Sequence, residues 1–429
     1  MSFDVRVKLW GNDIGIAFKQ DGSDYVLFEY DKNFIRSGIE LSPIVMPLSN
    51  KVYSFPALNF NSFKGLPGLL ADSLPDKFGN AVINQWLAKQ GRTEDSFSQM
   101  ERLCYIGTRG MGALEYEPAI SLSETNDDSI EVDKLAELAE QILSKRKNSS
   151  IKTDDYSMEQ IMQVGTSAGG ARAKAILAIN NKTGLIKSGQ VNQGPNFEYW
   201  IMKFDGIESN GDKEGSDKPE YCKREYAYYL MAIESGIEMS ESKLFEENGR
   251  THFLTKRFDR IQETGEKIHM QSLAALAHYD FNMAGANSYE QVASIIFKLG
   301  MGQAEIKQLY RRAVFNIMAR NQDDHVKNIS FLMDKSGKWS LSPAYDITYA
   351  YNPGKPWTGV HQMSLNGKRD GFTTNDLILA ADNMNIKESE AKKIITDVRN
   401  AIDKWPEYSH QANLSNVQID YVSNNLVRF

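Results

Sequence analysis

The sequence predicts an α+β protein with a β-rich N-terminal part and a mainly helical C-terminal lobe. Short apolar or alternating runs fill the first 120 positions, and a second group of strand-length runs follows residue 165. Helical patterns then dominate from about residue 272 onward. At 429 residues the chain is too long for one ordinary core, so we expect more than one domain.

The strand signals are clearest near the N-terminus. VRVKLW and IGIAFKQ alternate around the turn Gly11-Asn12-Asp13, which is typical of a hairpin, and YVLFEY follows an Asp-Gly turn. Gly-Pro-rich turns then lead into a helix from about Pro75, and a glycine-rich turn at 107–112 precedes the strand-like ALEYEP. We expect a β-rich subdomain over residues 1–120.

A polar, acidic stretch, SLSETNDDS, follows and predicts a linker, with an amphipathic helix after it in the region 121–150. Residues 151–258 read as a second β-rich part with the strands AKAILAIN, NFEYWIMKF and HFLTKRF, and the helix EYAYYLMAIESG between the last two. Residues 259–429 form the expected helical lobe, interrupted by one loop-rich window at 321–367.

Charge and composition exclude several classes of protein. The net charge of −7 disfavours direct binding of nucleic acid by the whole surface. The two cysteines lie far apart and form no CxxC pair, so a reducing compartment fits best. We find no apolar core of a secretory signal and no run long enough for a membrane span, and therefore expect a cytoplasmic protein with no membrane contact.

The most informative window is ARNQDDHVKNISFLMDKSGKWSLSPAYDITYAYN. Asp323 precedes Asn328 by five residues, and Asp346 lies eighteen further on. Phosphoryl transfer needs a carboxylate that orients the attacking hydroxyl, and oxygen ligands for a Mg²⁺ ion on the nucleotide phosphates. ISFLMD and KWSLSP predict a hairpin that would return Asp346 toward Asn328, with His325 and Lys327 interleaved. The alternative is that these are only polar turn residues that cap strands.

Two further windows could complete a nucleotide site. The glycine-rich VGTSAGGARAKAILAIN can bring backbone N–H groups close to phosphate oxygens, although it matches neither a Walker A motif nor GxGxxG. A flexible surface turn is the alternative, and Ser167 within it is a candidate phosphorylation site. Lys203, on an apolar strand, could hold phosphates with Glu225 of the next helix as its partner, or it could be a solvated strand end.

The segment LTKRFDR lies where the β-rich part gives way to the helical part. A kinase hinge binds adenine through its backbone at such a place, and Asp259 could bind ribose hydroxyls. Arg257, Asp259 and Arg260 could equally form a surface ion pair of little energetic value. No HExxH motif or paired metal-ligand spacing supports a zinc enzyme.

Together these windows resemble the HipA family of bacterial toxin–antitoxin kinases, which have a bilobal protein-kinase-like fold. FKGLPGLLADSLPDKFG and IGTRGMGALEYEP are similar to its N-terminal segment, SAGGARAK to its glycine-rich loop, KRFDR to its hinge, QDDHVKN to its catalytic loop and SPAYDI to its metal-binding segment. The resemblance implies that Asp323 is the catalytic carboxylate, in preference to Asp324, and that Asn328 and Asp346 hold Mg²⁺. The residues it implies for ATP binding are Gly169, Gly170, Ala171, Arg172, Ala173, Lys174, Lys203, Lys256, Arg257, Phe258, His325, Val326, Lys327, Asn328, Tyr345 and Asp346.

The same resemblance implies an ATP- and Mg²⁺-dependent serine/threonine protein kinase that acts as a toxin on a translation protein such as an aminoacyl-tRNA synthetase. Ser167 matches the serine whose autophosphorylation inactivates family toxins. A helix-turn-helix antitoxin of the HipB type is the implied partner, and DNA would be bound mainly through it. Two alternatives are a small-molecule phosphotransferase on the same fold and a non-catalytic co-repressor bound to the antitoxin.

Overall fold

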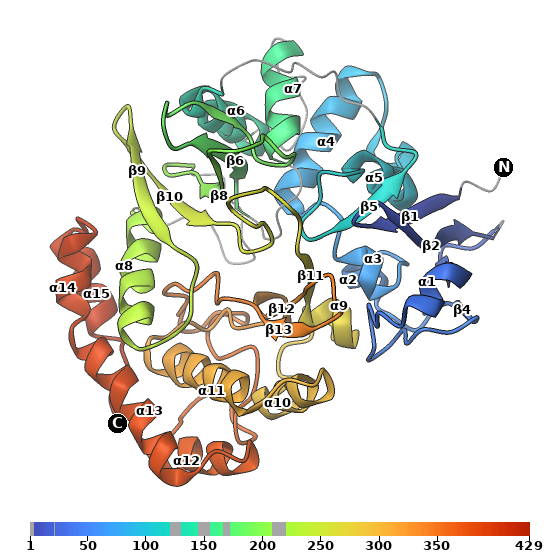
Figure 1. Ribbon diagram of the computed structural model, residues 1–429. Helices are drawn as coiled ribbons and strands as arrows, with labels where there is room; N and C mark the ends of the chain where they lie inside the picture. The colour runs from blue at the N-terminus through green and yellow to red at the C-terminus, as the bar shows by residue number, and fades with distance from the viewer. Residues whose placement is uncertain (1–3, 21, 121–129, 145–154, 166–171, 208–219) are drawn as a thin grey trace. The chain divides into compact units, whose positions relative to one another are not determined.

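The computed structural model describes residues 4–20, 22–120, 130–144, 155–165, 172–207 and 220–429 (Figure 1). The chain divides into two compact units. The first comprises Met1–Pro219, Lys243–Gln271 and Met333–Gly337, and the second comprises Glu220–Ser242, Ser272–Leu332 and Lys338–Phe429. The linker expected at residues 121–129 lies outside the described residues.

An antiparallel sheet of order β4-β3-β2-β1-β5 begins the first unit. Its strands are β1 (Val5–Leu9), β2 (Asn12–Lys19), β3 (Val26–Tyr30), β4 (Val52–Tyr53) and β5 (Leu114–Glu117). The predicted N-terminal hairpin is confirmed, because β1 pairs with β2 from Val5 opposite Ala17 to Leu9 opposite Asn12. The alternating pattern of β1 buries Val5, Val7 and Leu9 on one face and leaves Arg6 exposed on the other.

Five of the described helices of the first unit lie between the strands of this sheet in the chain, and two follow it. They are α1 (Lys32–Ser37), α2 (Phe60–Phe63), α3 (Gly68–Ala71), α4 (Lys77–Lys89), α5 (Gln99–Ile106), α6 (Val132–Ser144) and α7 (Asp155–Val164), with a 3₁₀ turn at Glu94–Ser96. Asp76 caps α4 by accepting a hydrogen bond from the Gly79 N–H, so the helix expected from about Pro75 is confirmed. Helix α4 packs against α6 and α7, and thereby joins the N-terminal segment to the second β-rich part.

The second sheet of this unit has the order β7-β6-β8-β10-β9. Its strands are β6 (Lys174–Asn180), β7 (Ile186–Ser188), β8 (Phe197–Lys203), β9 (Ser242–Glu247) and β10 (Arg250–Lys256). The three predicted strands are β6, β8 and β10. The edge strands β7 and β9 were missed because β7 is short and β9 carries charges along the sequence SKLFEE.

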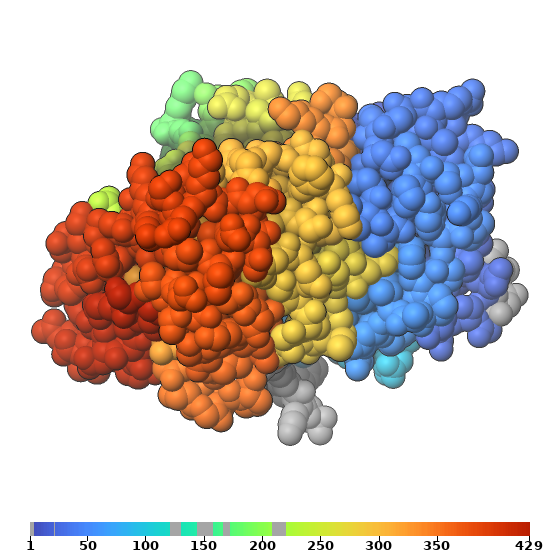
Figure 2. Space-filling view, turned by 90° about the horizontal axis from the view of Figure 1, so that it is seen from below, coloured from blue at the N-terminus to red at the C-terminus, as the bar shows by residue number. Residues whose placement is uncertain are grey.

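The second unit is mainly helical, as expected. Its helices are α8 (Tyr221–Glu234), α9 (Leu273–Ala277), α10 (Tyr289–Lys298), α11 (Gln303–Met318), α12 (Thr374–Asn383), α13 (Glu388–Asp403), α14 (Trp405–Gln411) and α15 (Asn416–Ser423). Helix α11 packs against α10 and α13, and α8 packs against α13 and α14 (Figure 1). In Figure 2 the C-terminal residues, drawn in red, form one continuous region of the surface. No helix in the described ranges is long and apolar enough to cross a membrane.

The expected domain boundary at 258/259 differs from the division into units. Residues 243–271 stay with the first unit because β10 pairs with β8, and the Arg257 N–H continues this ladder to the Tyr199 carbonyl at 2.9 Å. Helix α8 lies before that boundary in the chain, yet it belongs to the helical unit because it packs against α13 and α14. A third sheet has the order β11 (His269–Ser272), β12 (Ser330–Met333) and β13 (Trp339–Leu341), and its last two strands are the predicted hairpin.

The buried His252 in β10 makes the stability of the protein depend on pH. Its Nδ1 accepts a hydrogen bond from the Asp205 N–H at 3.0 Å, and burial lowers the pKa of His252 to about 4. The unfolded chain binds this proton near pH 6.5, so the stabilisation is present above that pH and is lost as the pH falls toward about 4.

We expect His252→Gln, which keeps a hydrogen-bond acceptor but cannot titrate, to lose less stability than the wild type on acidification. Between about pH 6.5 and 4 the two unfolding free energies should converge or cross, with slopes that differ by about 1.4 kcal/mol per pH unit. Urea denaturation at a series of pH values measures both slopes. Parallel curves over this range would show that His252 does not stay neutral in the folded protein.

Candidate active site

The predicted catalytic loop leaves the C-terminal end of α11 and runs to β12. Arg320 has a left-handed backbone, with φ of 57°, which turns the chain sharply after the helix. Its carbonyl accepts a hydrogen bond from the Ala350 N–H at 3.0 Å, and its guanidinium lies 4.5 Å from the centre of the Tyr351 ring. These two contacts hold the first residue of the turn in place, and the residues of the catalytic loop follow directly.

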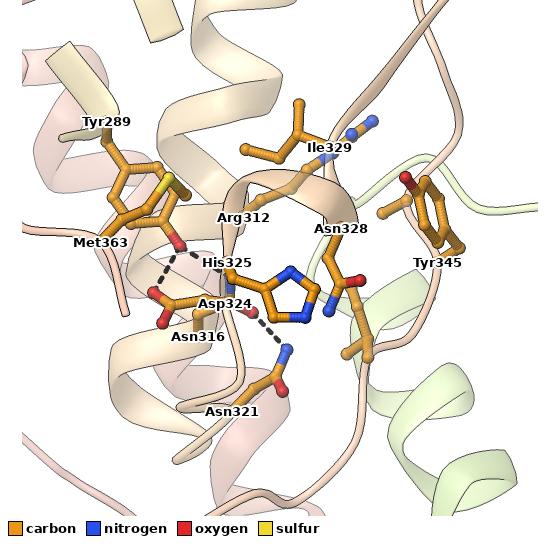
Figure 3. A pocket seen from close by; sticks show the side chains of 12 residues that line it. Tyr289, Arg312, Asn316, Asn321, Asp324, His325, Asn328, Ile329, Tyr345 and Met363 are labelled. Carbon is orange, nitrogen blue, oxygen red and sulfur yellow. Dashed lines mark hydrogen bonds between the residues drawn. The ribbon is translucent and has the colours of Figure 1, made fainter. Parts of the chain in front are cut away.

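Asp324 is the anchor of this loop, and its side chain is only 1% exposed. The carboxylate accepts hydrogen bonds from the Tyr289 hydroxyl at 2.8 Å and the Gln362 N–H at 2.7 Å, and His361 Nδ1 lies 3.0 Å away. Because an ionised carboxylate only accepts, His361 donates this bond. The Tyr289 hydroxyl also accepts from Asn316, whose amide oxygen accepts from Asn321 (Figure 3).

These donors decide the charge of Asp324. Burial by itself would raise the pKa of this carboxyl, but the attraction of His361 and the hydrogen bonds from His361, Gln362 and Tyr289 hold it below its usual value. Asp324 is therefore ionised at neutral pH and enclosed by its donors. A carboxylate held in this way supports the loop, and a substrate cannot reach it.

Asp323, the neighbouring carboxylate, is 31% exposed. Its Oδ1 accepts a hydrogen bond from Trp357 Nε1 at 2.6 Å and lies 3.8 Å from His325 Nε2. The Asp323 carbonyl accepts from Asn328 Nδ2 at 2.9 Å. The contrast with Asp324 favours Asp323 as the carboxylate that a substrate can approach, although its catalytic role stays a prediction.

The residues between Asp324 and β12 form a tight 3₁₀ turn, Val326–Asn328. His325 Nδ1 accepts a hydrogen bond from the Lys327 N–H at 3.3 Å, so in neutral His325 the proton lies on Nε2, which faces Asp323. Val326 is buried, and Lys327 Nζ lies 4.7 Å from the centre of the Phe281 ring. Helix α9 packs against this turn, which fixes its place in the second unit.

The predicted hairpin brings the metal-binding segment back to the catalytic loop. The Ser342 N–H donates to the Ser330 carbonyl at 2.9 Å. The Tyr345 hydroxyl contacts the Lys327 carbonyl at 2.7 Å and Ser330 Oγ at 2.5 Å. In Figure 3, Asn328 and Tyr345 lie on one side of His325, and Asp324 and Tyr289 lie on the other. Tyr345 thus directly precedes Asp346 and stands beside the loop that carries Asn328.

Asn328 and Asp346 have the chemistry that a magnesium ion requires. Since the Asn328 amide nitrogen donates to Asp323, its oxygen is the atom left for a cation. Asp346 has a positive φ of 53°, a strained conformation for a residue other than glycine and one that clusters at functional sites. Neither belongs to a group of three or more His, Cys, Asp or Glu residues, and the described parts of the chain contain no such metal-binding group.

A small pocket of about 20 Å³ lies behind the loop. It has room for roughly one water molecule, so it is not a nucleotide site. Arg312 lines it, donates to the Ser342 carbonyl at 2.7 Å, and has its pKa lowered to about 10 by burial. The other lining residues are Tyr289, Asn316, Asn321, Asp324, His325, Asn328, Ile329, Ala344, Tyr345, Ile347 and Met363.

Lys174, from the predicted glycine-rich segment, lies at the start of a strand in the first unit. Lys174 was expected to face phosphates from the glycine-rich loop, but it begins β6, is 4% exposed, and pairs with Asp76 at 3.1 Å. This ion pair joins β6 to the start of α4, and the contact of Lys174 with phosphates stays a prediction. Lys203, the last residue of β8, lies directly opposite Lys174 in the ladder and is 8% exposed.

The expected hinge residue Asp259 also has another role. Its buried carboxylate accepts hydrogen bonds from Arg257 at 2.8 and 2.9 Å, from Arg260 at 2.8 Å and from the Gly112 N–H at 2.7 Å. Binding of ribose by Asp259 is therefore not supported. Gly112 has a φ of +70°, and a Cβ there would lie 2.9 Å from the Met270 nitrogen, so only glycine fits this contact.

The same cluster corrects the alternative of a surface ion pair. The Arg257 and Asp259 side chains are fully buried, and Arg257 and Arg260 also donate to the carbonyls of Gly189 and Gly110. Burial by itself would raise the pKa of Asp259, but the two guanidinium groups hold it far below its usual value. The cluster thus ties the glycine-rich turn at 107–112 to the segment after β10. Lys256 pairs with Glu198 at 2.8 Å, and Phe258 is half-buried.

Other predicted site residues stay untested. Ser167, Gly169, Gly170 and Ala171 lie outside the described residues. Arg172 is half-buried and Ala173 is buried immediately before β6. Lys203 belongs to the first unit and Glu225 to the second, so their pairing remains a prediction.

Three residues of this site were not found from the sequence. Asp324 was noticed only as a neighbour of Asp323, and His361 and Trp357 were not singled out. They lie more than thirty positions beyond the aspartates in an irregular loop, where no periodicity or spacing predicts a contact. Only the paired aspartates in QDDH hinted at such a residue. One catalytic role explains one carboxylate, so the adjacent carboxylate needs another role.

Comparison with models of known protein families shows to which family this chain belongs. The HipA N-terminal domain matches residues 5–117, and the HipA-like C-terminal domain matches residues 166–405, more than half of the chain. The chain belongs to the HipA family. The family resemblance expected from the sequence motifs is thereby confirmed.

Two curated relatives carry names that describe a kinase. A "Putative kinase" of Haemophilus influenzae is 26% identical over 161 residues, which cover 34% of this chain and 47% of that protein. "Putative kinase Y4dM" of Sinorhizobium fredii is 23% identical over 221 residues, which cover 48% of this chain and 50% of that protein. The chain therefore spans about half the length of these relatives.

A solved structure confirms the fold class. The HipA of Shewanella oneidensis MR-1, in a complex of HipA, HipB and operator DNA, matches with a TM-score of 0.68 and 18% identity. The match covers 98% of this chain and 94% of that one. The protein thus has the α+β, kinase-like fold of HipA.

The buried Asp259 cluster predicts a large effect of one substitution on stability. Asp259→Asn would leave two arginines buried without their counter-charge, so we expect the free energy of unfolding to fall by about 3–5 kcal/mol. Glu266→Gln is the matched control, because Glu266 pairs with Lys335 at 2.6 Å on the exposed surface of the same unit. That change should cost no more than about 1 kcal/mol. Chemical denaturation measures both variants, and equal losses would contradict this account of the cluster.

Proposed function

We propose that this HipA-family chain is an ATP- and Mg²⁺-dependent serine/threonine protein kinase and the toxin of a type II toxin–antitoxin pair. The observation that carries the proposal is that the two adjacent aspartates differ in burial and in hydrogen bonding. Asp324 is enclosed and holds the loop, while Asp323 remains accessible with Asn328 five residues on. A phosphotransferase needs such an accessible, positioned carboxylate, whereas a purely structural turn does not.

In the proposed reaction a hydroxyl oxygen of the substrate protein forms a bond to the γ-phosphorus, and the bond from this phosphorus to the bridging oxygen of ADP breaks. Asp323 orients the hydroxyl and takes its proton. Asn328 and Asp346 would hold Mg²⁺, which neutralises charge on the phosphates when it is bound. Lys203 would bind phosphate oxygens, and the hinge backbone at Lys256 to Phe258 would lie at the adenine.

We expect Asp323→Asn to reduce phosphoryl transfer by at least roughly 100-fold, because the neutral amide cannot accept the hydroxyl proton. Labelled ATP incubated with a cell lysate and the purified protein measures this transfer. A labelled protein band that disappears with Asp323→Asn supports a protein kinase. Label confined to small molecules would favour a small-molecule phosphotransferase, and full activity of the variant would exclude the role of Asp323.

Ser167 is the proposed site of autophosphorylation, by family resemblance. Mass spectrometry after incubation with ATP should find one phosphate on Ser167 in the wild type and none in Asp323→Asn. An unmodified Ser167 under conditions of active transfer would reject this form of regulation. The substrate class, a translation protein such as an aminoacyl-tRNA synthetase, rests on the same resemblance and is identified by the labelled band.

The proposed partner is a helix-turn-helix antitoxin of the HipB type, since the Shewanella relative was solved with HipB and operator DNA. The chain carries a net charge of −7, so DNA would be bound mainly through the antitoxin, in the cytoplasm. We expect the purified chain alone to leave operator DNA unshifted in a gel at about 150 mM salt. Retention of DNA by the chain alone would contradict this assignment.

A further inference from the structure

Residues 350–362, the return segment, follow the metal-binding segment and fold back along the catalytic turn. The Ala350 N–H donates to the Arg320 carbonyl at 3.0 Å, and His361 and Gln362 donate to Asp324 at 3.0 and 2.7 Å. These contacts fix both ends of the segment to the turn. Between them, Trp357 donates from Nε1 to Asp323 Oδ1 at 2.6 Å.

We infer that Trp357 is a positioning residue, which holds the Asp323 carboxylate in the orientation that phosphoryl transfer requires. This inference rests on the proposed function and names a further residue for it. Asp323 is partly exposed, and the terminal torsion of an aspartate is broad, so a hydrogen bond to one carboxylate oxygen narrows the orientations of the group. A short bond from an N–H group to an ionised carboxylate is among the stronger hydrogen bonds and restricts that torsion.

The indole is itself held in place. The Gln362 amide donates to the Trp357 carbonyl, and the Asn352 N–H donates to the Thr358 carbonyl at 3.1 Å, which closes the loop around Trp357. The Trp357 ring lies 6.2 Å from the His325 ring, centre to centre. The donor therefore comes from a hydrogen-bonded loop that is anchored on Asp324. A donor fixed in advance costs no rearrangement when the substrate binds.

A different reading of the same contact is that Trp357 covers Asp323 and blocks it. The indole is half-buried, and its contact with the carboxylate goes through the ring edge that carries the N–H group. The contact at Oδ1 favours orientation, because the Asp323 side chain stays 31% exposed beside the indole, whereas that of Asp324 is 1% exposed. The two readings predict opposite effects of removing the N–H group.

The test is Trp357→Phe, which removes the N–H donor and keeps an aromatic ring. A second variant carries 3-benzothienylalanine at position 357, which replaces the N–H group by sulfur and retains the size of the indole. Trp405→Phe is the matched control, because Trp405 is buried in the same unit and donates from Nε1 to the Ile419 carbonyl at 3.1 Å. For each full-length protein, kcat, KM for ATP, nucleotide affinity and Tm are measured.

We expect both position-357 variants to lose roughly 10- to 100-fold in kcat, since a small misplacement of a reacting group has effects of this size. Nucleotide affinity and KM for ATP should stay within about twofold, because the adenine and phosphate residues are unchanged. Trp405→Phe should lower Tm and leave kcat near the wild-type value. A loss of kcat that appears only with Phe, and not with 3-benzothienylalanine, overturns the role of the N–H group.

Unchanged or raised kcat in both position-357 variants also overturns the inference, and a raised value assigns Trp357 to blocking. Failure of the proposed function would be seen in a different variant, Asp323→Asn. If Asp323→Asn transfers phosphate as fast as the wild type, the proposed chemistry at Asp323 is wrong and the inference about Trp357 falls with it. If Asp323→Asn is inactive and the Trp357 variants are not, only the inference about Trp357 is overturned.

Discussion

The candidate site depends on the buried charge of Asp324. An ionised carboxylate removed from water must be compensated, and three donors from two separate parts of the second unit converge on it. Tyr289 comes from α10, and His361 and Gln362 come from the return segment. The need to satisfy one buried charge therefore fixes the catalytic turn against a helix and against the return segment.

Consequences of this anchor extend to the neighbouring residues. With Asp324 enclosed, Asp323 is left accessible, and the return segment that supplies His361 and Gln362 also brings Trp357 to Asp323. The 3₁₀ turn that follows places Asn328 against the Asp323 carbonyl, and the hairpin after it returns Tyr345 to the Lys327 carbonyl. One buried interaction thus organises the carboxylate and both proposed metal ligands.

Local sequence patterns predicted the secondary structure elements that depend on neighbouring residues. The β1–β2 hairpin, the strands β6, β8 and β10, the helical second unit and the β12–β13 hairpin follow from periodicity and turn residues. The roles of Lys174 and Asp259 could not be read in this way. Each is a buried charge that is paired with a group far away in the sequence. Lys174 pairs with Asp76, and Asp259 accepts from the Gly112 N–H in addition to its two arginines. Trp357 escaped prediction for the same reason.

The most direct test of this account compares Asp323→Asn with Asp324→Asn in two measurements, the free energy of unfolding and the rate of phosphoryl transfer from ATP. We predict that Asp324→Asn costs about 3 kcal/mol of stability, because the donors around it lose a buried charge. Asp323→Asn should keep its stability within roughly 0.5 kcal/mol, as expected for an accessible side chain, and lose transfer. The reverse pattern, with a destabilised Asp323→Asn and a stable but inactive Asp324→Asn, would contradict the assignment of an anchoring and a reacting aspartate.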